Sequence, residues 1–243
     1  MNTYANPIPP VLGEIRHACR FCSLHEFCWP LGFDSRLLRR LQAVVRRSEA
    51  MPAGTVVFRI GDQFTAIYAV RTGCIKTCSV DAGGHELVHG FHLRGELFGF
   101  DAVYPDQHRC NAQALEATSL CVVPFIEIDR LGAEFQSLHA RIRRVMGREF
   151  TRQRMCGAGF GARQRVAAFL INIYSRLHRP NSAEYQFRLP MSREDIASYL
   201  GISAETLSRQ LAWLQKMKLI RVDRRNIRLV DLTRLGLIAQ GVS

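Results

Sequence analysis

Four cysteines have the residue type and spacing that could hold a metal centre. Three lie near the N-terminus in the run Cys19-Arg-Phe-Cys22-Ser-Leu-His-Glu-Phe-Cys28, and the fourth, Cys121, lies far downstream. Four thiolates can form a cage for an iron-sulfur cluster or, less specifically, for zinc. Because an iron-sulfur cluster is a redox centre, such a cage would act as a sensor of redox conditions.

The spacing of the cysteines leaves both the metal and the fourth ligand open. His17 and His25 lie close enough in the sequence to replace a sulfur ligand in a zinc site. Cys110 competes as the fourth ligand, whereas Cys74 and Cys78 share the face of an expected strand and are interpreted as buried packing residues. In a reducing cytosol, the eight cysteines are expected to be ligands, sensors or buried thiols rather than disulfides.

The composition is typical of a globular protein with a polyanionic partner. The chain has 243 residues, of which 47% are hydrophobic and 22% charged, and this is enough for two modest domains. Prolines interrupt the mildly apolar start of the chain, and no run of about 18 apolar residues follows, so we expect a cytoplasmic protein without a membrane span. The formal net charge of +12 favours a polyanionic partner, although arginine-rich surfaces also occur on proteins that bind no nucleic acid.

An all-β domain is expected between residues 51 and 124. Short β-branched or aromatic runs alternate there with glycines, which is typical of strands joined by tight turns. The clearest strands are 56–58, 67–70 and 120–123, and the spacing of the turns predicts a small antiparallel barrel or roll. Residues 1–30, which carry the cysteine cluster, form an arm that looks too short to fold without a staple such as a metal.

A long amphipathic helix is expected over residues 126–156, because apolar residues recur there at steps of three and four. They are Leu131, Phe135, Leu138, Ile142, Val145, Met146 and Phe150. The stripe is either a core face or a dimer seam. The length of the helix favours a seam in a symmetric homodimer, and the residues expected to form it are Leu138, Ile142, Val145, Met146 and Phe150. The run Gly157-Ala-Gly159-Phe-Gly161 should end the helix and act as a linker.

The segment from Ser192 to Arg209 has the order of a helix-turn-helix. Ser192 can cap the first helix, with Asp195 returning a hydrogen bond, and Gly201 supplies the tight turn. Ser203 then caps a second helix. The expected core residues of the motif are Ile196, Leu200, Ile202, Leu207 and Leu211.

The exposed face of the second helix carries groups that suit a base pair. Glu205, Ser208 and Arg209 are spaced at i, i+3 and i+4, so their side chains share one face. Glutamate accepts from cytosine N4 and arginine donates to guanine O6 and N7, so this face could read both halves of a G·C pair in the major groove. The alternative is a solvated helix with an ordinary i, i+4 ion pair.

A basic wing is expected after the second helix. Strands at 221–223 and 227–230 flank a turn that contains Arg224 and Arg225. Together with the helix caps, the glycine turn and the net positive charge, this wing favours a DNA reader over a merely solvated helix. The expected DNA-contacting residues are Ser203, Glu205, Ser208, Arg209, Arg224 and Arg225.

The run His85-Glu86-Leu-Val-His89 matches the His-Glu-x-x-His pattern of zinc metalloenzymes. That chemistry needs a helix, which places both imidazoles on one face with the glutamate beside the zinc-bound water. Glycines flank the motif and the surroundings are expected strands, so we interpret the match as accidental and expect no enzyme. A strand at this position would exclude the metalloenzyme.

The chain as a whole resembles the FNR branch of the CRP/FNR family of bacterial transcription regulators. The motifs that carry the resemblance span nearly all of the sequence in the family's order. They are the cysteine arm, Gly90-Phe-His-Leu93, Gly95-Glu-Leu-Phe-Gly-Phe-Asp-Ala102, Ala112-Gln-Ala-Leu-Glu116 ahead of Cys121, and Glu205-Thr-Leu-Ser-Arg209.

The resemblance implies an α+β fold: an antiparallel β-roll sensor domain of the cyclic-nucleotide-binding type, a long dimerisation helix and a C-terminal winged helix-turn-helix. The expected boundaries are 1–30 for the iron-sulfur arm, 31–125 for the roll, 126–156 for the helix and 157–243 for the DNA-binding domain. The resemblance also implies a 4Fe-4S cluster on the four cysteines of the cage, which oxygen destroys, so that the homodimer binds DNA when oxygen is low. The implied partners are RNA polymerase and an operator like TTGAT-N4-ATCAA.

Two positions depart from the family pattern, and one alternative ligand stays open. The Gly157–Gly161 run falls where members keep an apolar helix, and Gln210 replaces an apolar residue of the recognition helix, which predicts looser packing there. Gly95-Glu96 and Arg109 sit where nucleotide-binding relatives hold ribose and phosphate, so a cyclic-nucleotide-responsive regulator of the same fold is the alternative function. Against it, Cys110-Asn111 departs from those relatives, and the cysteine arm would have no role.

Overall fold

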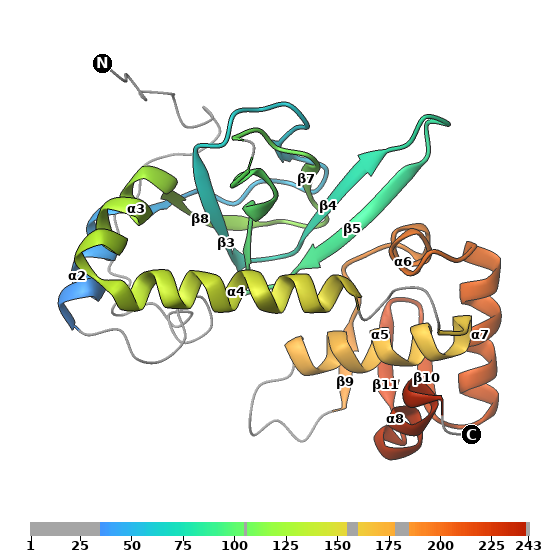
Figure 1. Ribbon diagram of the computed structural model, residues 1–243. Helices are drawn as coiled ribbons and strands as arrows, with labels where there is room; N and C mark the ends of the chain where they lie inside the picture. Colours follow the sequence, from blue (N-terminus) through green and yellow to red (C-terminus); the bar gives the residue numbers. More distant parts are fainter. Residues whose placement is uncertain (1–34, 105, 155–159, 178–184, 242–243) are drawn as a thin grey trace. The chain divides into compact units, whose positions relative to one another are not determined.

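The computed structural model describes residues 35–104, 106–154, 160–177 and 185–241 (Figure 1). The chain divides into two compact units. The N-terminal unit contains the described residues up to Ser79 together with Phe91–Phe150, and the C-terminal unit contains Val80–Gly90 and the described residues from Thr151 onward. The predicted arm with Cys19, Cys22 and Cys28 lies outside the described residues, as does most of the predicted glycine linker.

Short antiparallel strands form two sheets in the predicted roll. The strand orders are β1-β8-β3-β6 and β2-β7-β4-β5. The bounds are β1 Arg46–Arg47, β2 Val56–Phe58, β3 Ala66–Thr72, β4 Ile75–Val80, β5 Glu86–His92, β6 Leu97–Phe98, β7 Asn111–Ala114 and β8 Ser119–Pro124, with a short 3-10 turn, η2, at Phe100–Ala102. The predicted strands at 56–58, 67–70 and 120–123 correspond to β2, β3 and β8, which confirms the antiparallel roll.

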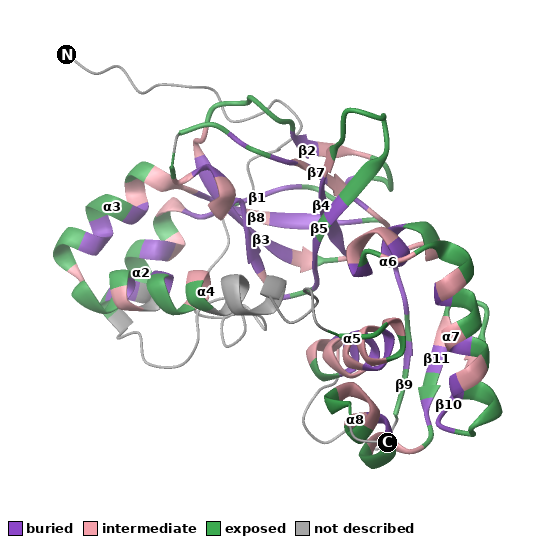
Figure 2. Ribbon diagram, turned by 45° about the vertical axis from the view of Figure 1, so that its right-hand side comes forward, coloured by how far each residue is buried: buried purple, intermediate pink, exposed green. Residues whose placement is uncertain are grey.

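Strand β3 shows how the two-residue period of a strand builds two cores. Ile67 and Ala69 face one side of the sheet and Tyr68 and Val70 face the other. All four are buried, because helices cover the first side and the second side is the interior of the roll (Figure 2). The helices on the first side are α2 Ser35–Val44, α3 Phe125–Glu134 and α4 Gln136–Arg154.

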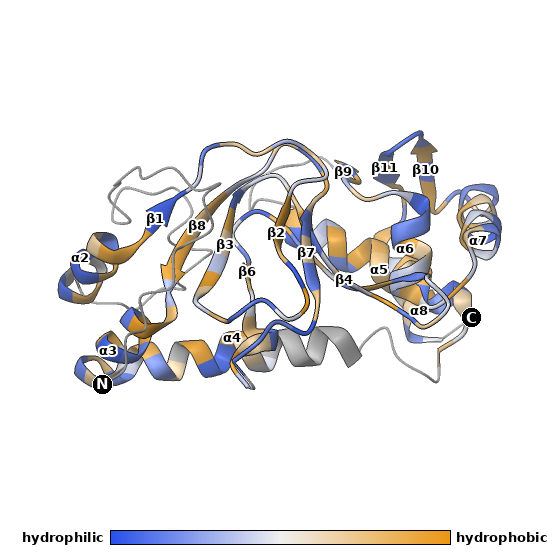
Figure 3. Ribbon diagram, turned by 90° about the horizontal axis from the view of Figure 1, so that it is seen from above, coloured by the Kyte–Doolittle hydropathy of each residue, from blue (hydrophilic) through white to orange (hydrophobic). Residues whose placement is uncertain are grey.

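Helix α2 is held against α3 by an ion-pair clamp as well as by apolar packing. Leu37 and Leu41 on its inner face are fully buried. On its outer face, Arg36 and Arg40 donate to the two oxygens of Glu134 at 2.8 and 3.0 Å. The alternation of hydrophilic and hydrophobic residues along α2 is visible in Figure 3. Because both arginines are mostly exposed, the clamp orients the helix more than it stabilises the fold.

The prediction of one helix over 126–156 is wrong, because the segment forms two helices. Phe135 interrupts them with an extended backbone at φ −125° and ψ 92°. Its ring packs against the same apolar core as Leu131 and Leu138, on either side of the break. No proline or glycine occupies the break itself, so tertiary packing rather than a local breaker bends the chain at this point.

The apolar stripe of α4 belongs, at least in its first part, to the core of its own unit. Leu138 is fully buried and Ile142 is 9% exposed, and both lie in the cluster between the helices and the sheet. This corrects their interpretation as seam residues, because the unit already covers them. Val145 and Met146 are half-buried against the same cluster, and the side chain of Phe150 lies outside the described residues. A dimer contact through the rest of α4 stays a prediction.

The C-terminal unit is a winged helix-turn-helix. Its elements are α5 Ala162–Leu177, β9 Gln186–Arg188, α6 Arg193–Leu200, α7 Ala204–Lys216, β10 Ile220–Asp223, β11 Asn226–Leu229 and α8 Leu232–Gln240. The strands pair in the order β10-β11-β9, so the predicted two-stranded wing has a third strand that the sequence did not reveal. Val80–Gly90 belongs to this unit, where Ser198 Oγ donates to the Glu86 carbonyl at 2.8 Å. None of the helices in the described ranges is long and apolar enough to cross a membrane.

Candidate nucleic-acid interface and cluster ligand

The helix-turn-helix begins with the predicted capping box. The Asp195 N–H donates to Ser192 Oγ at 3.0 Å, and the Ser192 N–H donates to Asp195 Oδ2 at 3.0 Å. These bonds satisfy two of the amide groups that a helix start leaves unpaired. Gly201 ends α6 in the left-handed conformation at φ 60° and ψ 41°, which a side chain would disfavour. The turn is therefore fixed by the residues that the sequence singled out.

Helix α7 presents the predicted trio on an open surface. Ser203 caps the helix by accepting from the Thr206 N–H at 3.1 Å. Glu205, Ser208 and Arg209 are all exposed, and Arg209 Nη2 donates to Thr206 Oγ1 at 3.1 Å. No ion pair joins Glu205 to Arg209 in the described part of the chain, so the simple i, i+4 pair is not the geometry observed. Both groups keep capacity for an external partner.

Apolar packing and one arginine clamp hold α7 from behind. Of the predicted core of the motif, Ile202 is half-buried and the other members are buried: Ile196, Leu200, Leu207 and Leu211. Arg163 of α5 donates to Gln210 Oε1 at 3.3 Å, and its guanidinium lies 3.8 Å from the centroid of the Trp213 ring. Gln210 is thus used in a polar contact between α5 and α7, so the position that departs from the family pattern has a structural role.

The wing concentrates positive charge at its tip and along its strands. Arg224 takes φ 52°, a left-handed backbone that asparagine or glycine usually occupies, and its side chain is exposed. Arg225 is less available than the sequence suggested, because its Nη1 donates to the Pro190 carbonyl at 3.2 Å. Sequence reasoning missed Arg221 and Arg228, which are exposed and lie directly opposite each other in the β10–β11 pair. Adjacent like charges destabilise a hairpin, and an anionic partner would relieve this cost.

Cys121 lies in β8 on the helix-covered side of the sheet. It is directly opposite Ala69 of β3 and Arg47 of β1. Among the described cysteines, Cys74, Cys78 and Cys110 are buried, whereas Cys121 is partly exposed. Within the described ranges, no three His, Cys, Asp or Glu side chains are grouped as metal ligands. Cys121 is therefore accessible enough to bind a metal centre that lies outside the packed core.

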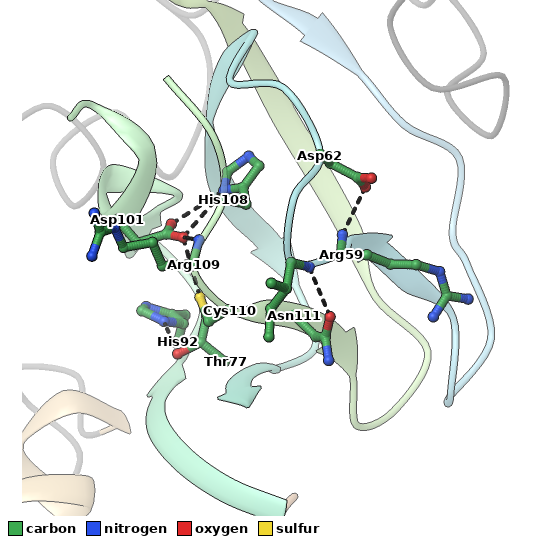
Figure 4. A network of polar contacts seen from close by, with 10 residues as sticks. Arg59, Asp62, Thr77, His92, Asp101, His108, Arg109, Cys110 and Asn111 are labelled. Atoms are coloured by element: carbon green, nitrogen blue, oxygen red, sulfur yellow. Dashed lines mark hydrogen bonds and ion pairs between the residues drawn. The ribbon is translucent and has the colours of Figure 1, made fainter. Parts of the chain in front are cut away.

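Cys110, the competing ligand, is engaged inside the roll (Figure 4). Its Sγ donates to Asp101 Oδ2 at 3.4 Å, and burial, aided by the Asp101 charge, raises the pKa of the thiol far above its ordinary value. Burial acts to raise the pKa of Asp101 as well, but hydrogen bonds from His108, the Arg109 N–H and Cys110 outweigh it and hold that pKa below the ordinary value. A thiol kept protonated is a poor metal ligand.

Two residues of the cyclic-nucleotide alternative, Glu96 and Arg109, make local hydrogen bonds within the roll. His108 is buried with its ring stacked 3.5 Å from that of Phe58, so the buried side of this segment packs against the aromatic core of the roll. The Arg109 N–H is used by Asp101 at 2.8 Å, and Glu96 Oε2 accepts from the Leu93 N–H at 2.9 Å. Glu96 thus makes a local turn contact, and the Arg109 side chain stays exposed.

The His85–His89 motif lies on a strand. Strand β5 runs from Glu86 to His92, and His85 directly precedes it. Residues four apart on a strand lie roughly 13 Å from each other, at about 3.3 Å per residue, which is too far for two imidazoles to share one zinc ion. The metalloenzyme interpretation is therefore excluded, as expected.

Comparison with known proteins relates both units to one family of regulators. A model described as a Crp-like helix-turn-helix domain matches residues 164–238, and one described as a cyclic nucleotide-binding domain matches residues 48–134. The transcriptional activator protein FnrA of Stutzerimonas stutzeri is 36% identical over 226 residues, which cover 92% of this chain and 93% of that protein. This chain belongs to the CRP/FNR family. It is accordingly a DNA-binding transcription regulator and not an enzyme.

Other members of the CRP/FNR family agree with this assignment. The fumarate and nitrate reduction regulatory protein of Vibrio cholerae is 34% identical over 228 residues, covering 93% of this chain and 91% of that protein. The structure of FixK2 from Bradyrhizobium japonicum matches with a TM-score of 0.73 and 25% identity, covering 80% of this chain and 97% of that one. The α+β fold of roll, helices and winged helix-turn-helix is therefore that of the family.

Proposed function

We propose that this CRP/FNR regulator responds to oxygen or redox state through a 4Fe-4S cluster held by Cys19, Cys22, Cys28 and Cys121. The observation that carries the proposal is the combination of the Cys-x2-Cys-x5-Cys arm with a partly exposed Cys121, beside three buried cysteines that are unsuited to this task. Thiolates from four positions fit an iron-sulfur cluster, which supplies a centre that oxidants can destroy. Zinc on the same sulfurs is the competing occupant.

The cluster is proposed to act by stabilising a homodimer. A symmetric dimer presents two recognition helices about one DNA turn apart, which suits an inverted repeat with half-sites centred roughly 10 base pairs from each other. The family resemblance suggests TTGAT-N4-ATCAA as the operator and RNA polymerase as the protein partner. In each half-site, Arg209 is proposed to donate to guanine and Glu205 to accept from the opposite cytosine, with Ser208 beside the neighbouring thymines.

The experiment that tests this function compares one sample in two states. Protein purified without air is titrated with a labelled TTGAT-N4-ATCAA duplex, exposed to air until its visible absorbance no longer changes, and titrated again. We expect tight binding before exposure and loss of specific binding afterwards, with zinc-reconstituted protein as the control. Equal affinity in both states would contradict an oxygen response while leaving DNA binding intact.

The exposed arginines on the strands of the wing are expected to bind DNA phosphates. Replacing Arg221 and Arg228 with alanine should weaken binding to all duplex sequences alike, because phosphates carry no base information. The salt dependence should also flatten, by about one unit of slope for each phosphate that an arginine no longer neutralises. The control is Arg234→Ala, which removes a single positive charge from the exposed surface of α8 and is compared with each arginine replaced singly. Binding isotherms at several salt concentrations check this, and a sequence-dependent loss would instead place the wing against bases.

The half-buried residues of α4 are expected to form the dimer contact. Met146→Glu should convert the anaerobic dimer to a monomer, because a partner helix would bury the new charge unpaired. Arg143→Glu, at an exposed position of the same helix, should leave the dimer intact. Ile142→Glu is unsuitable for this purpose, because Ile142 is in the core of its own unit and the charge would unfold that unit. Light scattering checks the mass, and a dimeric Met146→Glu protein would remove α4 from the interface.

A further inference from the structure

A buried arginine lies next to Cys121. Arg47 of β1 is the direct cross-strand partner of Cys121 in β8, whereas its neighbour Arg46 is the partner of Val122. Directly opposite residues of an antiparallel pair place their side chains on the same face, so Arg47 and Cys121 face the same side of the sheet and Arg46 faces away. Ser48 fixes this register by accepting from the Leu120 N–H at 2.8 Å.

The Arg47 side chain is buried, with at least one guanidinium nitrogen left unpaired. The residue is only 5% exposed, and its Nε is buried without a hydrogen-bond acceptor. Within the described residues, no carboxylate forms an ion pair with Arg47, in contrast to Arg36 and Arg40, which share Glu134. Arginine keeps its charge in proteins, so burying it without a counter-charge is costly. A negatively charged group on the Cys121 side of the sheet would therefore stabilise Arg47.

We propose that Arg47 is the counter-charge of the cluster bound at Cys121, and this rests on the function proposed above. Four thiolates outweigh the positive charge of a 4Fe-4S core, so the ligated group is an anion that can accept a hydrogen bond at sulfur. Ala69 flanks Cys121 on its other side with only a methyl group, so Arg47 is the cross-strand neighbour able to donate. Arg47 is a positioning residue in this account, because it acts on the cluster without ligating iron.

A counter-charge predicts opposite effects on the empty and the loaded protein. In the apoprotein, Arg47→Met removes an uncompensated buried charge, so the midpoint of thermal unfolding should stay the same or rise. In the loaded protein, the same change should speed anaerobic loss of iron to a chelator by about 10-fold or more, the scale of lost outer-shell partners of metal sites. Arg47→Lys, which keeps a donor and a charge, should restore most of the retention.

The experiment uses the full chain, reconstituted without air with iron and sulfide, in four versions: wild type, Arg47→Met, Arg47→Lys and Arg46→Met. Arg46→Met is the matched control from the same strand and should retain iron as wild type does. The rival partner of Arg47 is a carboxylate that precedes the described residues, Glu14, Glu26 or Asp34, and in that case Arg47→Met would destabilise the apoprotein as much as the loaded protein.

The outcomes separate this inference from the function on which it rests. An unchanged or higher unfolding midpoint of the empty Arg47→Met protein, together with faster iron loss that Arg47→Lys rescues, would support the counter-charge. A wild type that takes up no iron would overturn the proposed function and this inference with it. A wild type that holds iron, with Arg47→Met losing it at the same rate or destabilised equally in both states, would overturn the counter-charge alone.

Discussion

Cys121→Ala protein is expected to contain no intact cluster and to have lost anaerobic binding to the operator. With three thiolates left, one iron of the cluster is open to solvent and the cage does not hold. The same result is expected for Cys19→Ala, Cys22→Ala and Cys28→Ala. Iron and sulfide content after anaerobic purification, together with duplex binding, measures the effect.

The controls for the ligand prediction are the buried cysteines. Cys74→Ala and Cys78→Ala remove a sulfur from a packed interior and should leave iron content unchanged. Cys110→Ala should do the same, because its thiol is engaged with Asp101 inside the roll. If Cys110→Ala removes the iron while Cys121→Ala keeps it, the fourth ligand has been assigned to the wrong strand.

Arg209→Ala is expected to weaken operator binding by about 1–3 kcal/mol in each half-site and to relax the preference at one base pair. The guanidinium is exposed and donates to Thr206 Oγ1 on its own helix, so it can turn to guanine O6 and N7 at little cost. The fold should survive, since the side chain contributes nothing to the core behind α7. Anaerobic titrations with the operator and with a variant substituted at the G·C pair provide the measurement.

The prediction is decided by the ratio of the dissociation constants for the substituted duplex and the operator. This ratio is measured for wild type and for Arg209→Ala. Wild type should discriminate the operator from the substituted duplex, and Arg209→Ala should discriminate them less. Arg224→Ala at the tip of the wing serves as the control, because it should weaken both duplexes equally. Equal discrimination by wild type and Arg209→Ala would mean that α7 does not read this base pair.

Local signals in the sequence were sufficient for the helix-turn-helix. The capping box at Ser192, the left-handed Gly201 and the cap at Ser203 each depend on neighbouring residues, and all three are present as expected. Three strands of the roll, β2, β3 and β8, were equally readable, because β-branched runs between glycines leave few alternatives. Where the geometry depended on a few neighbouring residues, as in these caps and this turn, the prediction was confirmed.

Features that depend on distant residues were not readable in this way. The break at Phe135 arises from packing on the sheet, and the burial of Ile142 arises from the same cluster, so the periodicity of α4 alone could not separate core from seam. The opposed Arg221 and Arg228 and the cross-strand pair of Arg47 with Cys121 require the register of the strands. Only the sheet topology brings these residues together.

Metal analysis of the wild-type chain purified without air, combined with its visible spectrum before and after exposure to air, decides whether the sensor is an iron-sulfur protein. We expect a straw-brown protein with about four iron atoms and about four sulfides per chain, whose visible band bleaches in air. A colourless protein that contains one zinc ion per chain, about the content of a closed four-ligand site, and binds the operator equally in air would contradict the proposed oxygen response.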